Sequence, residues 1–176
     1  MIAATKDFVS KSEHRPFHKY IKLNFSSDGN EVTAIAVYGY RLSVEHAMIS
    51  DCDEDFTVYV KPGIKLPSKN YATFTLENNE VIIRCDGFVF GYEQPAPTEF
   101  DWEKAVPPGE PVFEIGFNGN YLLSALQAAK VSCGNTFKHP VILEFRAPEL
   151  PILLRTNKED LKMVLPVRIN KRKEST

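Results

Sequence analysis

Alternation of apolar and polar residues with a period of two dominates this chain, and turn residues interrupt it at short intervals. A period of two puts successive side chains on opposite faces of an extended strand, so each run predicts a half-buried strand. Asp86-Gly87 is the kind of pair that a type I′ hairpin turn requires, and it joins two such runs. We predict strands over residues 20–25, 31–37, 41–49, 56–60, 72–76, 80–85, 88–92, 141–145, 152–155 and 161–168.

Two stretches have helical spacing instead. The weaker covers about residues 3–12, with Phe8 and Val9 as its apolar contacts. The stronger covers residues 120–131, and Asn118 or Asn120 can cap its first turn. Its apolar residues share one face at helical spacing: Tyr121, Leu122, Ala125, Leu126 and Ala129.

The order of these elements recurs along the chain. The first 50 residues contain a helix and three strands, and residues 112–169 contain a strand, a helix and three strands. Residues 56–93 repeat the strand and the three-strand meander, with a loop containing Pro62 and Pro67 in place of the helix. A recurring unit of about 50–60 residues is an internal repeat. The pattern predicts an α+β fold of repeated (β)αβββ units, with two helices on one face of antiparallel sheets.

Composition and motifs argue against an enzyme. The four histidines are scattered and none sits in a zinc or nucleophile signature. Asp51, Asp53 and Asp55 alternate as in a calcium loop, but Phe56 and Pro62 occupy the positions that need Gly and a bidentate Glu. We therefore predict no catalytic residue, no metal site and no cofactor.

Charge and cysteine content narrow the class further. The net charge of −2 excludes a general polybasic nucleic-acid binder, although a local basic face stays open. Cys52, Cys85 and Cys133 are odd in number and widely spaced, which predicts buried, reduced thiols. No apolar run has the length of a signal or membrane segment, so we expect a cytoplasmic protein with no membrane partner.

Four stretches resemble one known family, the β subunit of bacterial DNA polymerase III, which is the replicative sliding clamp. Residues 34–44 (AIAVYGYRLSV) are similar to its A-T-D-G-H-R-L-A segment, and residues 117–126 (FNGNYLLSAL) to its F-N-x-x-Y-L-L-D-A-L helix start. Residues 165–169 (LPVRI) are similar to its C-terminal M-P-x-R-L, and residues 100–107 (FDWEKAVP) to its F-P-D-Y-x-x-V-I-P linker. The four stretches follow the family's order over residues 8–169, so the resemblance implies a clamp-like fold.

The resemblance also implies a shortened form. The family's subunit carries three domains of two helix-bearing repeats each, whereas this chain matches one complete repeat and one helix-less repeat (1–106) and a C-terminal repeat (107–170). The charged tail, 171–176, has nothing to bury and is predicted to be disordered. Closure of a ring by two copies, as in the family's usual dimer, is not implied.

Members of the family hold partner peptides in an outer groove, so the resemblance implies a peptide site here. Apolar pockets would receive peptide side chains, and arginines at the rim would hold carbonyl or carboxylate groups. From the residues alone, the alternative is that Leu42 and Val167 belong to strand core and that both arginines are solvated. The implied groove residues are Val37, Gly39, Tyr40, Arg41, Leu42, Lys104, Ala105, Leu165, Pro166, Val167 and Arg168.

Two functions remain open. The first is a sliding-clamp-like accessory protein of DNA replication or repair that binds peptides of DNA polymerase or of the clamp loader. As a homo-oligomer it would also contact duplex DNA through Lys6, Lys11 and Lys130. The second is an adaptor or decoy module that keeps the groove and does not encircle DNA. Ser124 and Gln127, uncharged on the open face of the stronger helix, favour the second.

Overall fold

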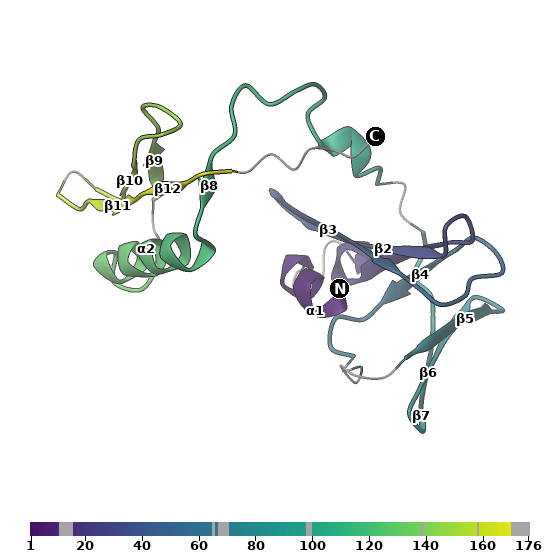
Figure 1. Ribbon diagram of the computed structural model, residues 1–176. Helices are drawn as coiled ribbons and strands as arrows, with labels where there is room; N and C mark the ends of the chain where they lie inside the picture. Colours follow the sequence, from purple (N-terminus) through teal and green to yellow (C-terminus); the bar gives the residue numbers. More distant parts are fainter. Residues whose placement is uncertain are drawn as a thin grey trace. The chain divides into compact units, whose positions relative to one another are not determined.

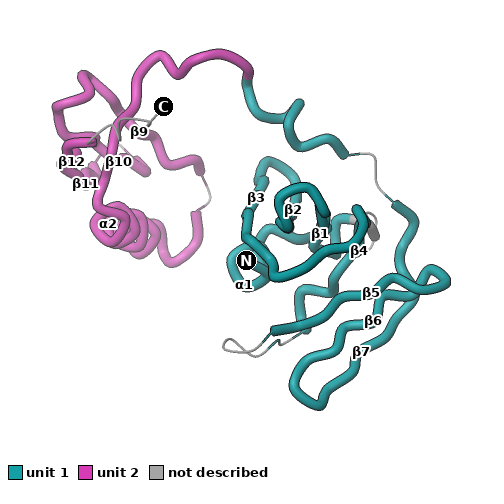
Figure 2. The backbone as a smooth tube through the Cα atoms, turned by 45° about the vertical axis from the view of Figure 1, so that its right-hand side comes forward, with its two compact units in different colours: residues 1–107 teal, residues 108–176 magenta. Residues whose placement is uncertain are grey.

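The chain folds into two compact units, Met1–Pro107 and Pro108–Thr176 (Figures 1 and 2). The computed structural model describes residues 1–10, 16–64, 66, 71–97, 100–137, 139–157 and 159–169. Every strand pairing recorded among them is antiparallel. The predicted α+β class with antiparallel sheets and two α-helices is confirmed, whereas the repeat content assigned to residues 1–106 and 107–170 stays a prediction.

The described elements of unit 1 are α1 (Ile2–Thr5), 3-10 helices at Lys6–Phe8, Pro16–Lys19 and Glu103–Ala105, and strands β1 (Ile21–Ser26), β2 (Glu31–Tyr38), β3 (Arg41–Met48), β4 (Phe56–Val60), β5 (Thr73–Glu77), β6 (Glu80–Cys85) and β7 (Phe88–Glu93). Those of unit 2 are β8 (Gly116–Phe117), α2 (Gly119–Ser132), β9 (Ile142–Glu144), β10 (Ile152–Arg155), β11 (Lys162–Val164) and β12 (Pro166–Val167). Most predicted strands therefore agree with the structure to within one or two residues.

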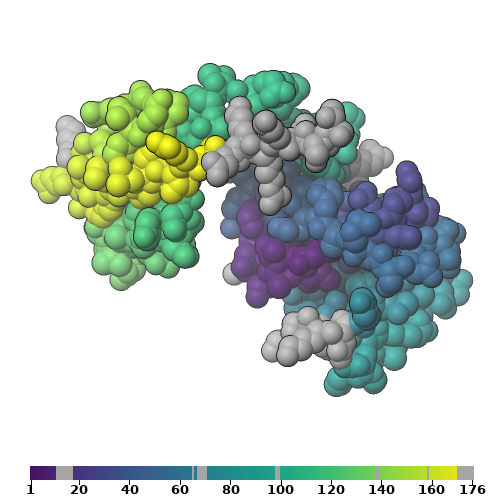
Figure 3. Space-filling model, in the orientation of Figure 1, coloured from purple at the N-terminus to yellow at the C-terminus, as the bar shows by residue number. Residues whose placement is uncertain are grey.

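The first sheet of unit 1 has the strand order β3-β2-β1-β4. Its inner face carries the alternate residues Ile21 and Leu23 of β1 and Ala34 of β2, all at most 2% exposed. Val81 and Ile83 of β6 pack against the same cluster, so the core lies between this sheet and the β5-β6-β7 meander. Figure 3 shows the N-terminal residues, in purple, at the surface of this unit beside its first strands, and α1 contacts β2 and β3.

The hairpins of the second sheet are closed by two-residue turns. Asp86 and Gly87 have φ values of 43° and 80°, so both occupy the left-handed region, as a type I′ turn requires. Asn78 and Asn79, at 50° and 66°, do the same between β5 and β6. Asn, Asp and Gly tolerate this region at low cost, so local turn chemistry sets the register of the whole meander.

Side chains from the end of β7 and from the residue that follows it form hydrogen bonds with the outer backbone edge of β4 and with Lys61 beside it. The Gln94 amide accepts from Tyr59 N at 2.6 Å and donates to Tyr59 O at 3.4 Å, and Gln94 is 8% exposed. The Tyr92 hydroxyl donates to Tyr59 O at 3.0 Å and accepts from Lys61 N at 3.1 Å. Burial raises the pKa of Tyr92, which keeps its phenol protonated as a donor. The β5-β6-β7 meander is thereby tied to the first sheet.

Replacing Gln94 with Ala is expected to lower the free energy of unfolding of unit 1 by about 1–3 kcal/mol, because the buried Tyr59 N–H loses its acceptor. Urea unfolding followed by circular dichroism measures the change. Gln127→Ala removes the same amide from an exposed position of α2 and serves as the control. Equal stability of the two variants would show that the Gln94 contact is dispensable.

In unit 2, α2 packs on the sheet with strand order β11-β10-β9. Asn118 caps the helix by accepting from Asn120 N at 3.0 Å and Tyr121 N at 3.4 Å, which settles the choice between the two predicted caps. The core consists of three buried residues, Ile152, Leu154 and Val164, with partly buried neighbours on the helix face: Leu122, Ala125 and Leu126. Tyr121 is 66% exposed, so its predicted place on this face is wrong.

The first helix and the last strand also differ from the prediction. The α-helix ends at Thr5, whose hydroxyl donates to Ile2 O at 3.1 Å, and a 3-10 turn carries the chain to Val9. Val9 is extended and its side chain is buried in the core, so the predicted helix is interrupted there, and its last residues, 11 and 12, lie outside the described residues. The predicted strand 161–168 is split between two sheets, because Pro166 has no N–H to continue the ladder beyond Val164.

Two smaller expectations have mixed outcomes. The three cysteines are free thiols, but Cys85 alone is fully buried, while Cys52 and Cys133 are half-buried. The tail 171–176 lies outside the described residues. None of the helices that the structure describes combines the length and the apolar character needed to span a membrane.

Candidate peptide-binding groove

The β2–β3 hairpin carries five of the predicted groove residues. Its two-residue turn consists of Gly39, with φ +61°, and Tyr40, whose φ is not positive. A positive φ at the first position only is the type II′ pattern, which places Gly there. Tyr40 consequently stands at the tip of the hairpin and is fully exposed.

The outer face of this hairpin is apolar. Val37 pairs with Leu42 across the ladder, and Ile35 pairs with Val44 one step further along. These residues alternate with buried Ala34 and Ala36, so their side chains lie on the face opposite the core. Val37 and Leu42 are both half-buried, which leaves part of each side chain open to a ligand.

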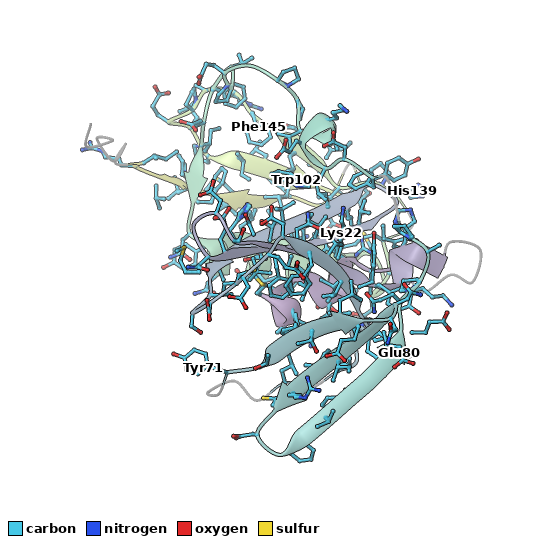
Figure 4. All side chains as sticks on the ribbon, turned by 90° about the vertical axis from the view of Figure 1, so that its right-hand side faces the viewer. Lys22, Tyr71, Glu80, Trp102, His139 and Phe145 are labelled. Atoms are coloured by element: carbon cyan, nitrogen blue, oxygen red, sulfur yellow. The ribbon has the colours of Figure 1, made fainter. Side chains whose placement is uncertain are left out.

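The connector after β7 returns to the same face. The Trp102 ring meets the His46 ring edge-on at a centroid distance of 6.1 Å, and His46 pairs with Thr33 two positions from Ile35. Trp102 also lies on the outer side of the sheet in Figure 4, the side to which Lys22 points. Phe100 and Val37 line a common cavity of about 20 Å³. The structure therefore brings the predicted linker and the predicted strand wall together within unit 1.

Lys104 and Ala105 lie in the 3-10 helix that follows Trp102, and both are exposed. Asp101 caps this turn by accepting from Glu103 N at 3.1 Å, and Lys104 Nζ lies 2.9 Å from Asp101 Oδ2. The hydrogen bond from Lys104 holds the pKa of Asp101 below its usual value and raises the pKa of Lys104. The Lys104 charge is thus partly neutralised by Asp101 at the end of this wall.

The Arg41 side chain is held by two aromatic rings. Its guanidinium carbon lies 5.9 Å from the centroid of the Phe8 ring and 5.6 Å from that of Tyr38, both in cation–π range. Arg41 thereby links the N-terminal segment to the hairpin. A carboxylate at the rim would have to compete with these rings for the guanidinium.

In unit 2, the predicted wall is β12 with its neighbours. Pro166 pairs with Phe117 and Val167 with Gly116. Leu165, Val167 and Ile169 are between 47% and 64% exposed, and Arg168 is exposed as well. A Cβ at Gly116 would lie 2.9 Å from Ile169 Cγ1 and 3.2 Å from Val167 O, so only glycine lets β12 approach β8 this closely.

The structure thus assembles each wall within its own unit. Val37, Leu42 and the linker form an apolar face in unit 1, and Leu165, Pro166 and Val167 form an exposed apolar edge in unit 2. That the two walls join as a single groove, with the eleven residues in the roles assigned above, stays a prediction.

The proposed DNA-facing lysines are spread over both units. Lys6 lies in the first 3-10 turn and Lys130 in the last turn of α2, and both are exposed, whereas Lys11 lies outside the described residues. Among the described residues, no group of three or more His, Cys, Asp or Glu side chains is placed to hold a metal ion.

Three contacts were missed from the sequence. The Trp102–His46 contact, the Gln94 amide on β4 and the close approach at Gly116 all join segments that are distant along the chain. Gly116 does carry a local signal, since an isolated glycine in a strand often marks close approach of another backbone. The partner strand, however, is unknown until the fold is known.

No family model matches this sequence, and no curated protein sequence matches it. Solved structures, in contrast, do match this chain. The β subunit of DNA polymerase from Streptococcus pyogenes is 17% identical, and the match covers 95% of this chain and 47% of that chain with a TM-score of 0.76. The DNA polymerase III β chain of Streptococcus pneumoniae gives 17% identity, coverage of 95% and 46%, and a TM-score of 0.78.

The Helicobacter pylori β clamp bound to a DNA ligase peptide is 13% identical, with coverage of 94% and 47% and a TM-score of 0.71. The chain therefore spans about half the length of these solved clamps. At sequence identities this low, structural similarity shows that the folds are alike and does not show a shared activity. This chain has the fold of the bacterial DNA polymerase III β-subunit sliding clamps over about half of their length.

Proposed function

We propose that this chain is a clamp-like accessory protein of DNA replication or repair that binds short partner peptides. The observation that carries the proposal is the outer face of the β2–β3 hairpin, where half-buried Val37 pairs with Leu42 and lines a small cavity together with Phe100 of the linker. The fold adds support, since one solved clamp with this fold holds a DNA ligase peptide. The role is a binding role without catalysis.

The peptide-binding walls differ in their chemistry. The wall in unit 1 supplies apolar side chains and the Lys104–Asp101 pair, and the wall in unit 2 supplies Leu165 and Val167 with Arg168 beside them. Apolar pockets flanked by a few polar groups suit a short apolar peptide with a polar backbone. The likeness to sliding clamps, rather than this chemistry, makes peptides of DNA polymerase or of a clamp loader the partners proposed.

Leu42→Asp and Val167→Asp are each expected to weaken peptide binding at least about 30-fold, since a carboxylate would be desolvated against an apolar ligand. Fluorescence anisotropy with the DNA ligase peptide that the Helicobacter pylori clamp binds measures the affinity. Phe88→Asp and Met163→Asp place the same charge on exposed residues of the two units and serve as matched controls. Circular dichroism confirms that each variant is folded.

Unchanged affinity in both groove variants, with folding retained, would rule out the proposed groove. Loss in Leu42→Asp alone would restrict binding to unit 1 and remove the role of β12. Loss in the control variants as well would indicate non-specific binding to exposed apolar residues rather than a site.

A second candidate, an adaptor or decoy that does not encircle DNA, is favoured by the composition of α2. Lys130 is the one charged residue in Gly119–Ser132, and the exposed positions Ser124 and Gln127 are neutral. A surface that tracks phosphates needs several cations. A Lys6→Glu, Lys11→Glu, Lys130→Glu variant separates the candidates, because weaker and less salt-dependent binding to duplex DNA is expected only for the first. The first candidate also includes a cytoplasmic location and assembly into a homo-oligomer.

A further inference from the structure

The outer edge of β5 is open among the described residues. Unit 1 contains two three-strand meanders, β1-β2-β3 and β5-β6-β7. In the first, the outer edge of the leading strand β1 pairs with β4 over five residue pairs. In the second, no described strand pairs with the equivalent edge of the leading strand β5. An unpaired edge exposes a row of backbone donors and acceptors that can take up another strand.

The register shows which backbone groups face this edge. Glu77 and Glu80 flank the two-residue turn and form its hydrogen-bonded pair, so Thr75 and Thr73 also bond to β6. The alternate residues Phe74 and Leu76 therefore direct their N–H and C=O groups away from β6. These are the groups that an added strand would meet.

A cavity of about 820 Å³ runs along this edge, within unit 1. All seven consecutive residues from Tyr71 to Glu77 line it. A cavity on one face of a strand would contact alternate residues, so contact with every residue places the cavity along the edge. The opposite wall is the loop from Met48 to Glu54, whose far end is anchored where Asp55 accepts from Ser27 N and Ser27 Oγ at 2.8 Å each. Tyr71 projects into solvent at the start of β5 (Figure 4).

The lining combines an apolar floor with an acidic rim. Phe25 stacks on Phe56 with ring centroids 4.5 Å apart and contacts Phe74 at 5.4 Å. Four carboxylates surround this floor, from Asp51, Asp53, Glu54 and Glu77. None of the described residues that line the cavity is Lys, Arg or His. A ligand with apolar side chains toward the rings and cations toward the rim is complementary to this lining.

We propose that the β5 edge binds an extended segment of a partner protein in which apolar residues alternate with Lys or Arg. The segment pairs with Phe74 and Leu76 through its backbone, as β4 pairs with β1, and places alternate side chains on the phenylalanine rings and toward the carboxylates. Pairing of β5 with β5 of a second copy would bring the four carboxylates of each copy together, so like charges oppose it. The site is separate from the groove proposed above and does not rest on it.

Hydrogen exchange of the full chain tests the proposal, with a short synthetic peptide of alternating valine and lysine as the probe. The amides of Phe74 and Leu76 are expected to gain at least about tenfold protection on peptide addition, while those of Thr73 and Thr75, already bonded to β6, change little. A valine–glutamate peptide of the same length is expected to give no protection. A gain at all four amides, or at none, would overturn the proposal.

Two protein variants sharpen the test. Leu76→Pro removes an outward N–H and leaves the β5–β6 ladder bonded, so the peptide is expected to lose binding while the hairpin amides keep their protection. Asp53→Lys is expected to weaken binding about tenfold at low salt, whereas Asp28→Lys, an equal change of charge outside the cavity, is expected to leave it unchanged. Protection that rises with protein concentration in the absence of peptide would assign the edge to self-association and overturn the proposal.

Discussion

Leu154→Ala is expected to unfold unit 2 while leaving unit 1 folded. Leu154 is fully buried at the centre of β10, and among the described residues of this unit only Ala129, Ile152 and Val164 are buried as well. Removing a buried leucine side chain costs about 2–5 kcal/mol. Cores of domains this small supply roughly 3–5 kcal/mol in total, so the loss approaches the whole stability of the unit.

Hydrogen exchange followed by mass spectrometry measures this effect region by region. Amides of α2, β10 and β11 are expected to lose protection, and amides of β1, β2 and β6 to keep it, because the two units have separate cores. Met163→Ala, on a side chain that is 60% exposed in the neighbouring strand, is the control and is expected to change little. Simultaneous loss of protection in both units would show that they unfold as one.

Gly116→Val is expected to detach β12 from β8. A Cβ at this position already lies 3.2 Å from Val167 O and 2.9 Å from Ile169 Cγ1, and the two methyl groups of valine add further volume at the contact. Because Val167 O is backbone, it cannot move aside without breaking the pairing with Gly116. Protease cleavage after Arg168 is expected to become faster, since the segment loses its place in the sheet.

Peptide binding provides a second measurement for the same variant. If β12 is a wall of the groove, Gly116→Val is expected to weaken the ligase peptide about tenfold, because Pro166 and Val167 are no longer held in position. Gly119→Ala is the matched control, since a Cβ there meets no atom within 4 Å. Faster proteolysis with unchanged peptide affinity would separate β12 from the binding site.

Elements with strong local signals agreed with the sequence prediction. The turn pairs at Asn78 and Asp86 closed the predicted hairpins, because positive φ values are a property of the turn residues themselves. The helix over residues 120–131 was predicted from its apolar spacing with Asn118 or Asn120 as its cap, and the structure confirms it as α2 and shows Asn118 as the cap. The ordered motifs also indicated the clamp fold, which the solved structures confirm.

Elements whose form depends on distant partners did not follow from local pattern. The strand predicted over residues 161–168 reads as one alternating run, yet Val164 pairs with Ile152 and Pro166 pairs with Phe117 in different sheets. The helix predicted to reach residue 12 ends early, because burial of Val9 requires an extended backbone. Tyr121 has helical spacing with the buried face, but no described core residue covers it.

In the candidate site, too, some features follow from local sequence and others depend on tertiary contacts. The sequence by itself determined which residues are apolar, where most strands lie and that the fold class is α+β, since alternation and turn chemistry act over a few residues. Only the tertiary structure decided that Trp102 contacts His46, that Val167 packs closely on Gly116 and that no described strand pairs with the outer edge of β5. Each of these depends on which distant segments come into contact, and burying one core face against another decides that.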